Sequence, residues 1–452
     1  MSGEEPDDNS VIAATLRVIP TTLNAVPTTM EAEASARSAR VETFFSTRNL
    51  QINAVEPVTS ARIFNPRPNT PRLPASIPAT TDSAPAAKPQ ATETTNNLGV
   101  LWVAIEATTV VTTFLVGHHR TPAALEASWK YIIICSVGIA VAFLGTTVLY
   151  LAGVHAHVAN PLDFTSLAAH AALLNAPVVR LAFTLIVFGY GTKAGLVPLF
   201  SWLPDAHGQA PAPVSALMSG VLLSVALSAI LRLRVIAVST LGPTFPRVLL
   251  LAIGIATLVV AAVMLLAQRD LKRLLAYSSM EHMGIMTVAA GVGGPLALSG
   301  VLLHILGHGL VKGVLFLDAG EVLRLEGTTR IARLGGLLAR RPALGAILAI
   351  GLAGLLGLPP FSIFVSELTM LRAEAGAGLW WVAAVVLGVL AIILAAILAH
   401  GRTMLLGPSE QSTRSPVSLV APLGVALGAA VWFGLVAWPL AHLLSLAAGI
   451  VA

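Results

Sequence analysis

The feature that most constrains this chain is a series of apolar segments long enough to cross a lipid bilayer. A spanning helix needs roughly 20 predominantly apolar residues, and about ten such segments follow residue 97. Of the 452 residues, 56% are hydrophobic and 11% are charged, whereas a soluble domain carries roughly 25% charged residues. The sequence therefore predicts an all-α polytopic membrane protein.

Two of the predicted spans contain an interruption. Proline removes a helix hydrogen bond and clashes with the turn before it, so we expect a break at Pro198 in the third span and another at Pro204 shortly after it. For the same reason we expect breaks at Pro359 and Pro360 in the eighth. Interruptions that recur five spans apart are typical of an internally repeated transporter with its working site at the breaks. The predicted spans cover residues 98–117, 129–152, 178–200, 212–235, 248–267, 273–292, 295–319, 342–372, 378–400 and 417–446.

The first 97 residues differ in character from the rest. They are rich in Pro, Thr, Ala and Ser, and they contain neither an apolar run of spanning length nor a signal peptide. We expect a polar, disordered tail over residues 1–97 and a membrane domain over residues 98–452. Lys and Arg gather on one side of the predicted spans, which the positive-inside rule assigns to the cytoplasm. This orientation would place the tail outside the cell, without a signal to export it.

The cysteine content limits the cofactors that this chain can hold. Cys135 is the single cysteine, which excludes a disulfide framework, a self-contained iron–sulfur cluster and a Cys-rich zinc site. Any redox cofactor would belong to another subunit. The basic residues of the membrane part are typical of topology signals, so we expect a lipid environment and no nucleic-acid partner.

Ionisable residues inside an apolar segment are costly, and they usually mark ion pathways. Lys193 lies beside the first break among residues that cannot solvate it, and we expect Glu106 of the first span to be its partner. The alternative for Glu106 is a purely structural ion pair or a helix-end carboxylate. After residues near segment ends are removed, the candidates for proton translocation are Glu106, Lys193, His282, His304, His308, Lys312 and Glu367.

His304, His308 and Lys312 are spaced four residues apart, so they form one stripe on an otherwise apolar helix. Neighbours on the stripe are about 6 Å apart, so a proton would need intervening water. Histidine exchanges protons near neutral pH, which favours a relay. Packing histidines are one alternative. A metal held by His304 and His308 is another, although the glutamate of the HExxH motif is missing.

His282 lies about two turns into the sixth span, beside Glu281, whose side chain points about 100° away round the helix. Glu281 either takes part in proton transfer or faces a neighbouring loop or serine cluster. Glu367 follows the second break by about two turns, which suits an acid where protons arrive or leave. The alternative for Glu367 is a surface carboxylate on a short helix.

A further group of charged residues lies at the predicted membrane edges. We interpret its members as loop-fixing and topology residues rather than proton carriers. They are Asp205, His207, Asp270, Lys272 and Arg273.

These residues lie in motifs that resemble the antiporter-like proton-translocating subunits of respiratory complex I, the M, N and L type of NADH:quinone oxidoreductase. The likeness covers residues 97–452 and is strongest to the hydrogenase-4 and formate-hydrogenlyase type of membrane subunit. The motifs are NNLGVLWVAIEATT, GTKAGLVPLFSWLPDAHGQAPAPVSALMSG, RDLKRLLAYSSMEHMGIM, HILGHGLVKGVLF and GLPPFSIFVSE.

The resemblance implies two inverted repeats and a chain of protonatable residues between them. Glu106 and Lys193 match a paired Glu and Lys, His282 and His308 match histidine positions, and Glu367 matches a terminal acid. It also implies a multi-pass protein of the bacterial inner membrane. Its implied partners are other membrane subunits and a peripheral redox arm with iron–sulfur, nickel–iron or flavin cofactors and a link to quinone.

Two departures from the family pattern accompany this resemblance. Ser224 stands where quinone-linked members have a central lysine, while Lys312 matches a lysine common in the hydrogenase-linked branch. The first half-channel would then be bridged by water or by Lys312 and the histidines. Family helices are also expected before the span that bears Glu106, which gives an inverted-repeat fold truncated at its N-terminus. We hypothesise that residues 1–97 reflect a misread start or a frameshift.

The sequence thus predicts a proton-translocating membrane subunit of a redox-driven complex. Electron transfer in partner subunits would separate Glu106 from Lys193 and drive a proton along the histidines and Lys312 to Glu367. One alternative is a cation/proton antiporter or ion-coupled uptake subunit without redox partners, with sodium or the proton as its ion. A truncated scaffold that transports nothing is the other.

Overall fold

The computed structural model describes residues 96–407, 417–436, 444–445 and 447–449. Apart from Asn96 and Asn97, the predicted tail lies outside the described residues, as does part of the last predicted span. The chain divides into two units, Met1–Ala84 and Pro85–Ala452, and the description below concerns the second.

The described residues are helical and contain no strand. Each predicted span has a helix at its place, so the prediction of an all-α membrane fold is confirmed. The helices are α4 (Leu98–Val116), α5 (Pro122–His155), α6 (Phe164–Ala169), α7 (Ala176–Lys193), α8 (Trp202–Gln209), α9 (Ala212–Leu217), α10 (Leu223–Leu241), α11 (Thr244–Leu266), α12 (Leu271–Val292), α13 (Gly294–Glu326), α14 (Leu337–Arg340), α15 (Pro342–Leu355), α16 (Ser362–Gly376), α17 (Trp380–Leu405) and α18 (Val417–Leu435).

Length and hydropathy identify six of the described helical segments as able to cross a membrane. Two shorter apolar helices, Pro342–Leu355 and Val420–Leu435, accompany them. α7 and α12 also match predicted spans but carry more polar residues. The six segments are Leu98–His119, Pro122–His155, Ala212–Leu241, Thr244–Leu266, Gly294–Glu326 and Trp380–Leu405.

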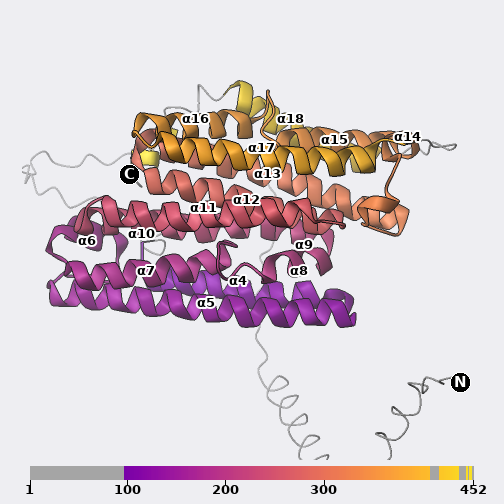
Figure 1. Cartoon of the computed structure of the whole chain (residues 1–452). Helices are drawn as coiled ribbons and strands as arrows, with labels where there is room; N and C mark the ends of the chain where they lie inside the picture. The colour runs from indigo at the N-terminus through magenta and orange to yellow at the C-terminus, as the bar shows by residue number, and fades with distance from the viewer. Residues whose placement is uncertain (1–95, 408–416, 437–443, 446, 450–452) are drawn as a thin grey trace, which may run out of the picture. The chain divides into compact units, whose positions relative to one another are not determined.

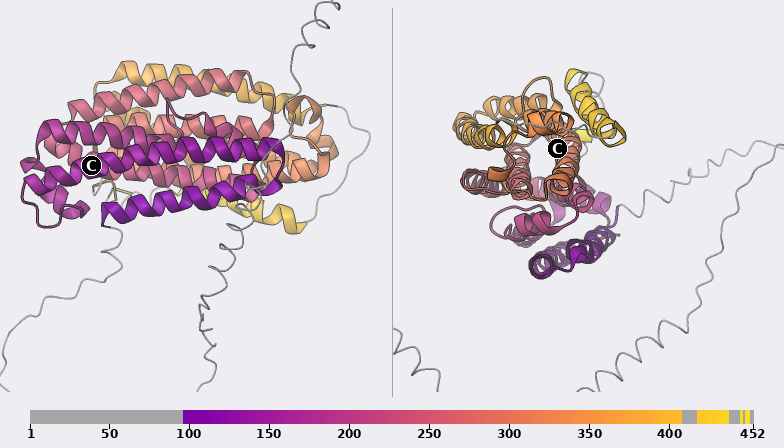
Figure 2. Two further views of the ribbon diagram at one scale, coloured as in Figure 1. Left: turned by 90° about the horizontal axis from the view of Figure 1, so that it is seen from below. Right: turned by 90° about the vertical axis from the view of Figure 1, so that its right-hand side faces the viewer.

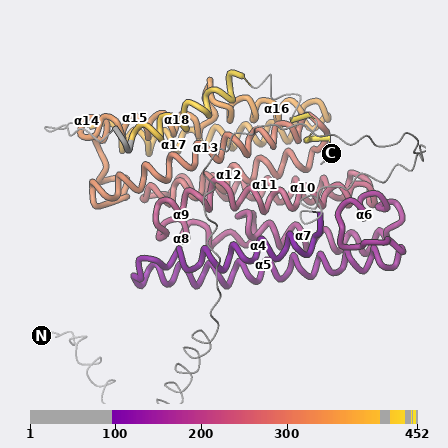
Figure 3. Tube along the Cα trace, turned by 180° about the vertical axis from the view of Figure 1, so that it is seen from behind, coloured from indigo at the N-terminus to yellow at the C-terminus, as the bar shows by residue number. Residues whose placement is uncertain are grey.

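The long helices run roughly parallel to one another, as Figure 1 shows. α4, α5 and α7 lie at one side, α15 to α18 lie at the other, and α10 to α13 lie between them (Figures 1 and 3). The right-hand view of Figure 2 looks at the same bundle nearly along the helix axes. α5 packs along α7, α11 along α12, and α13 against α16. This order places α12 and α13 at the centre.

Small residues let the helices approach closely, as expected where apolar lipid offers little drive for helices to associate. A Cβ at Gly145 of α5 would lie 2.9 Å from the carbonyl oxygen of Ala182 in α7. A Cβ at Gly254 of α11 would lie 2.8 Å from the backbone nitrogen of Val288 in α12. Along α12, nearly every residue is buried, which explains why this helix tolerates more polar residues than its neighbours.

Both predicted breaks are present, and they share one design. α7 ends at Lys193 and α8 begins at Trp202, while α15 ends at Leu355 and α16 begins at Ser362. Each gap contains a glycine with positive φ, 77° at Gly195 and 59° at Gly357. Three residues after each glycine comes a proline, preceded by a cis peptide bond. The sequences Gly-Leu-Val-Pro and Gly-Leu-Pro-Pro are therefore two copies of one break.

The backbone groups that the first break frees find partners, as they must in a membrane. The Val197 N–H donates to Thr257 of α11 over 3.1 Å, and Trp202 Nε1 donates to the Thr192 carbonyl over 2.9 Å. The prediction of a break at Pro204 is wrong. Pro204 lies in the first turn of α8, where an N–H has no helical partner and proline is tolerated.

Replacing Gly357 with alanine should destabilise the second break. A left-handed φ costs a residue with a Cβ roughly 1–2 kcal/mol, and the new Cβ would lie 2.9 Å from Cδ of Glu367. We expect a lower unfolding temperature for the purified protein in detergent.

Gly388→Ala in α17 is the matched control for this variant. No neighbouring atom lies within 4 Å of a Cβ at that position, and alanine favours a helix. If Gly357→Ala unfolds at the same temperature as Gly388→Ala, the strain assigned to this glycine is refuted.

Candidate functional site

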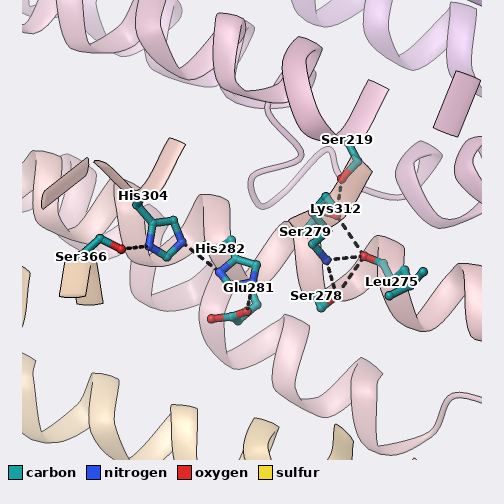
Figure 4. A network of polar contacts seen from close by, with 9 residues as sticks. All are labelled: Ser219, Leu275, Ser278, Ser279, Glu281, His282, His304, Lys312 and Ser366. Atoms are coloured by element: carbon teal, nitrogen blue, oxygen red, sulfur yellow. Dashed lines mark hydrogen bonds and ion pairs between the residues drawn. The ribbon is translucent and has the colours of Figure 1, made fainter. Parts of the chain in front are cut away.

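The predicted proton-translocation residues fall into two groups. Lys193 and Glu106 lie where α4, α5 and α7 meet. The other five residues lie where α12, α13 and α16 meet, and Figure 4 shows most of that group in detail. The second group contains His282, His304, His308, Lys312 and Glu367.

Lys193 is the last residue of α7, and only 2% of its surface is exposed. Its ammonium group donates to Thr109 Oγ1 over 3.0 Å and to the Tyr131 hydroxyl over 2.5 Å. It also lies 4.7 Å from the centre of the Tyr131 ring, a cation–π distance. Thr112 holds the Tyr131 hydroxyl from the other side over 2.6 Å. Neutral oxygen atoms and an aromatic face therefore solvate this lysine.

Glu106 does not form the predicted ion pair with Lys193. Its Oε1 accepts a hydrogen bond of 2.9 Å from Ser136 of α5, and its Oε2 has no partner among the described residues. Thr109, which accepts from Lys193, follows Glu106 by three residues on α4, so the two charges are separated by about one helical turn. They share a site without touching.

Lys312 is completely buried on α13, and neutral groups of α12 hold it. Its ammonium group donates to the Leu275 carbonyl over 2.8 Å and also to Ser278 Oγ. The next residue, Ser279, shares a hydrogen bond of 2.7 Å with Ser219, and both serines are fully buried (Figure 4). Lys312 forms no ion pair with any described residue.

The predicted stripe on α13 exists, and the missing step between its histidines is provided by α12. His304, His308 and Lys312 are all fully buried. His282 enters between the two histidines: its Nδ1 lies 2.9 Å from Nε2 of His304, and its ring centre lies 5.1 Å from that of His308. Another imidazole therefore lies between His304 and His308, where the sequence predicted water.

The second break holds Glu367 in place. Its carboxylate lies against Gly357, so the missing side chain of this glycine gives it room. Glu367 and Glu281 both line a cavity of ≈ 250 Å³, whose other walls are apolar residues of α15 and α17. Glu367 is half-buried and turned toward this cavity, which disfavours the surface-carboxylate interpretation.

Three of these residues could hold a metal ion. One ligand atom each from His282, His304 and Glu367 lie within 4.8 Å of one another. The predicted metal alternative, His304 with His308, does not form such a group among the described residues. The 2.9 Å between the two imidazole nitrogens suits a shared proton, since two nitrogen ligands on tetrahedral zinc lie roughly 3.3 Å apart.

Asp205 pairs with Lys130 at 3.1 Å and with Arg273 at 2.6 Å, and Lys272 donates to the carbonyls of Gly208 and Ala210. These contacts fit the predicted loop-fixing role. His207 makes no hydrogen bond to a described residue, so it does not fix a loop in this way.

His207 is fully buried, and neither ring nitrogen has a partner among the described residues. Its ring packs edge-on between those of Trp202 and Phe316. Trp202 in turn packs on Tyr131, so His207 lies between the Lys193 group and α13. The break before α8 brings it inward, which spacing alone could not reveal.

Other buried polar groups escaped the sequence interpretation. Asp318 and Glu374 are fully buried, and their carboxylate oxygens have no partners among the described residues. Ser224, which the resemblance places at the position of a central lysine, is also buried on α10, and its hydroxyl has no partner among the described residues. Asp318 lies only six residues beyond Lys312 in the same helix, so a stricter search for acids inside apolar segments would have found it.

Comparisons with known proteins identify the family of this chain. Residues 95–394 match the family model described as "NADH:quinone oxidoreductase/Mrp antiporter, TM". The chain is 44% identical over 286 residues to a hydrogenase-4 component F homolog of Methylacidiphilum infernorum, covering 62% of this chain and 59% of that protein. It is 35% identical to NADH-quinone oxidoreductase subunit N of Desulforudis audaxviator, covering 63% of this chain and 56% of that protein. The chain thus spans less than two thirds of these curated relatives.

A solved structure also shares the fold. A chain of the membrane-bound sulfane sulfur reductase, an archaeal respiratory membrane complex, superposes with a TM-score of 0.73. The two are 28% identical, and the match covers 79% of this chain and 72% of that one. The likeness therefore extends over most of the described helices.

Tyr131→Phe should destabilise the Lys193 site. The variant removes the hydroxyl that accepts from the buried ammonium group, and a hydrogen bond to a charged group is worth about 1.5–3 kcal/mol. We expect a lower unfolding temperature for the purified protein.

Tyr150→Phe is the matched control for Tyr131→Phe. Tyr150 lies on the same helix, is half-buried and makes no hydrogen bond to a described residue. Equal stability of both variants would show that the Tyr131 hydroxyl does not support Lys193.

Proposed function

Because this chain belongs to the NADH:quinone oxidoreductase/Mrp antiporter transmembrane family, we propose that it moves protons across the membrane as a subunit of a redox-driven complex. One observation carries the proposal: protonatable side chains of α12, α13 and α16 follow one another inside a bundle of apolar helices. Ionisable groups in such a setting are costly to keep and are typical of proton relays.

The proposed route begins at the end of the bundle where the basic residues gather. A cavity of ≈ 460 Å³ lies there, bounded by Lys272, by residues 208–213 and by the end of α13. It reaches the residue after His207, the buried histidine between the two groups. We propose that protons pass from this cavity to the α13 stripe by way of His207.

Within the second group the protonatable side chains are neighbours. His308 lies one turn of α13 before Lys312, a gap of about 6 Å that water would bridge, and His282 contacts both His308 and His304. Imidazole gains and loses protons near neutral pH and can pass them between its two nitrogens. Glu367 then provides the acid at the far side, in the second break.

The Lys193 group would serve as the control element of the route. Its ammonium group is held by a hydroxyl and an aromatic ring beside Glu106, so a small shift of α4 or α7 would change the distance between the two charges. Coulomb interactions at such distances in a protein are worth a few kcal/mol, enough to change proton occupancy. A redox event in a partner subunit could drive such a shift.

The remaining parts of the proposal concern the assembly. The chain would work with other membrane subunits and a peripheral arm that carries the redox cofactors, and it would hold none itself. Its proposed location is the inner membrane of a bacterial cell, with the basic end of the bundle in the cytoplasm.

Reconstitution of the purified complex tests this function. In liposomes that contain a pH-sensitive dye, Lys193→Ala and Glu367→Gln should each lower the proton flux about tenfold or more. Glu367→Gln removes the acid that receives the transferred proton, and Lys193→Ala removes the charge that controls the route. Glu126→Gln is the control for charge loss, since Glu126 is an exposed residue that pairs with Lys130 at the membrane edge.

Native proton flux in both Lys193→Ala and Glu367→Gln would reject the transport function and favour a scaffold. A flux that follows a sodium gradient and persists with a protonophore would instead indicate a cation-coupled subunit.

A further inference from the structure

Among the carboxylates of the described residues, Glu281 comes nearest to the histidines, while Glu367 lies within 4.8 Å of His282 and His304. Glu281 is 2% exposed in the middle of α12, and its Oε2 lies 3.5 Å from Nε2 of His282. It does not face a loop or the serine cluster, the alternative that its helix position left open. The route proposed above gives it no role.

The directions of the hydrogen bonds show which end of the histidine chain can exchange a proton. Ser366 donates its hydroxyl hydrogen to the Ile363 carbonyl over 2.7 Å, so its oxygen must accept from Nδ1 of His304. A neutral His304 then has a free lone pair on Nε2, which accepts from Nδ1 of His282. This series of hydrogen bonds therefore ends where Ser366 donates to a backbone carbonyl, and a carbonyl cannot pass a proton on.

The other end of this series, at His282, faces a group that can take up a proton. With Nδ1 protonated, neutral His282 turns the lone pair of Nε2 toward Glu281. Two lone pairs at 3.5 Å repel unless one of them carries a proton, so the Glu281–His282 pair holds one proton. Figure 4 shows this order of groups, from Ser366 through the two imidazoles to Glu281.

The far side of Glu281 opens on the cavity that Glu367 also lines. At ≈ 250 Å³ this space is large enough for several water molecules, since each water occupies about 30 Å³ in the liquid. The two carboxylates are the polar groups of the cavity wall, which is otherwise formed by Leu, Ile and Ala side chains. Water between the two acids would connect them.

The internal repeat also points to a functional position for Glu281. α4 and α12 each precede a broken helix by two spans, and they belong to the first and sixth predicted spans. Glu106 on α4 lies beside the site of Lys193, and Lys193 is the residue that ends α7 before the first break. Glu281 on α12 shares a cavity with Glu367, which lies on α16 after the second break. Glu281 is thus the second half's counterpart of Glu106.

We propose that Glu281 transfers protons between His282 and Glu367, an inference that rests on the proposed function. The Nε2 proton of imidazolium His282 passes to the Glu281 carboxylate, which leaves a neutral imidazole and a neutral carboxylic acid. The acid then releases this proton to water in the cavity, and the Glu367 carboxylate takes it up. One proton moves, and no electron is transferred.

The test uses the reconstituted complex with Glu281→Gln, Glu281→Asp and Glu374→Gln. Glutamine keeps the shape but cannot carry the proton, so the proton flux should fall about tenfold or more, as for loss of a general acid–base group. Aspartate restores a carboxylate and should recover part of the flux. Glu374→Gln is the control, because it removes a different fully buried carboxylate, on α16. It should leave the flux within about twofold of the native value.

A second readout follows the imidazole itself. With ¹⁵N-labelled histidine, NMR of the native complex should show His282 sharing its Nε2 proton with a carboxylate, and this signal should shift in Glu281→Gln. Co-purification of the partner subunits checks that each variant assembles.

The outcomes separate the two proposals. Native flux in Glu281→Gln, together with loss of flux in Glu367→Gln, refutes the role of Glu281 and leaves the proposed function standing. If no variant, Lys193→Ala included, alters proton flux, the proposed function fails, and the NMR signal then decides whether Glu281 holds the proton. An unchanged His282 signal in Glu281→Gln refutes that assignment as well.

Discussion

The cost of placing a charge in hydrocarbon governs this structure. A charged side chain at the centre of a spanning helix costs roughly 2.5–3.5 kcal/mol on insertion scales, so each must be turned inward and solvated by protein. The chain solvates its two central lysines with neutral groups. Lys193 has Thr109 and Tyr131, and Lys312 has Leu275 and Ser278. Such a lysine can lose its proton without leaving an unpaired carboxylate behind, which suits proton exchange better than a tight ion pair.

The central position of α12 follows from the same constraint. Its polar residues would be expensive against lipid, and α8, α11, α13 and α16 cover it. Burial on all sides also makes α12 the element that contacts both ends of the relay. It provides the carbonyl and hydroxyl that hold Lys312, and it provides the imidazole between His304 and His308.

The two breaks show how one backbone device serves two kinds of chemistry. In each, a glycine with positive φ and a proline three residues later stop one half-helix and start the next. Lys193 precedes the first glycine by two residues, whereas Glu367 follows the second by ten. A repeated break therefore places a base at one site and an acid at another, and side-chain identity decides the role of each.

The sequence by itself determined the spans, both breaks and seven ionisable residues inside the bundle, although it did not identify the buried Asp318 and Glu374. Hydropathy, proline and glycine act locally, so they can be read within one segment; the exception was Pro204, whose effect depends on where α8 begins. The stripe of His304, His308 and Lys312 was predictable for the same reason, because it lies on a single helix.

Only the tertiary structure decided which groups meet. In the folded chain Glu106 accepts from Ser136, and Lys193 donates to Tyr131. His282 lies between two histidines of another helix, and His207 is buried. These contacts depend on how each helix is rotated and how deep it lies relative to its neighbours. Many residues on both helices set those quantities together, and the spacing along one helix does not contain them.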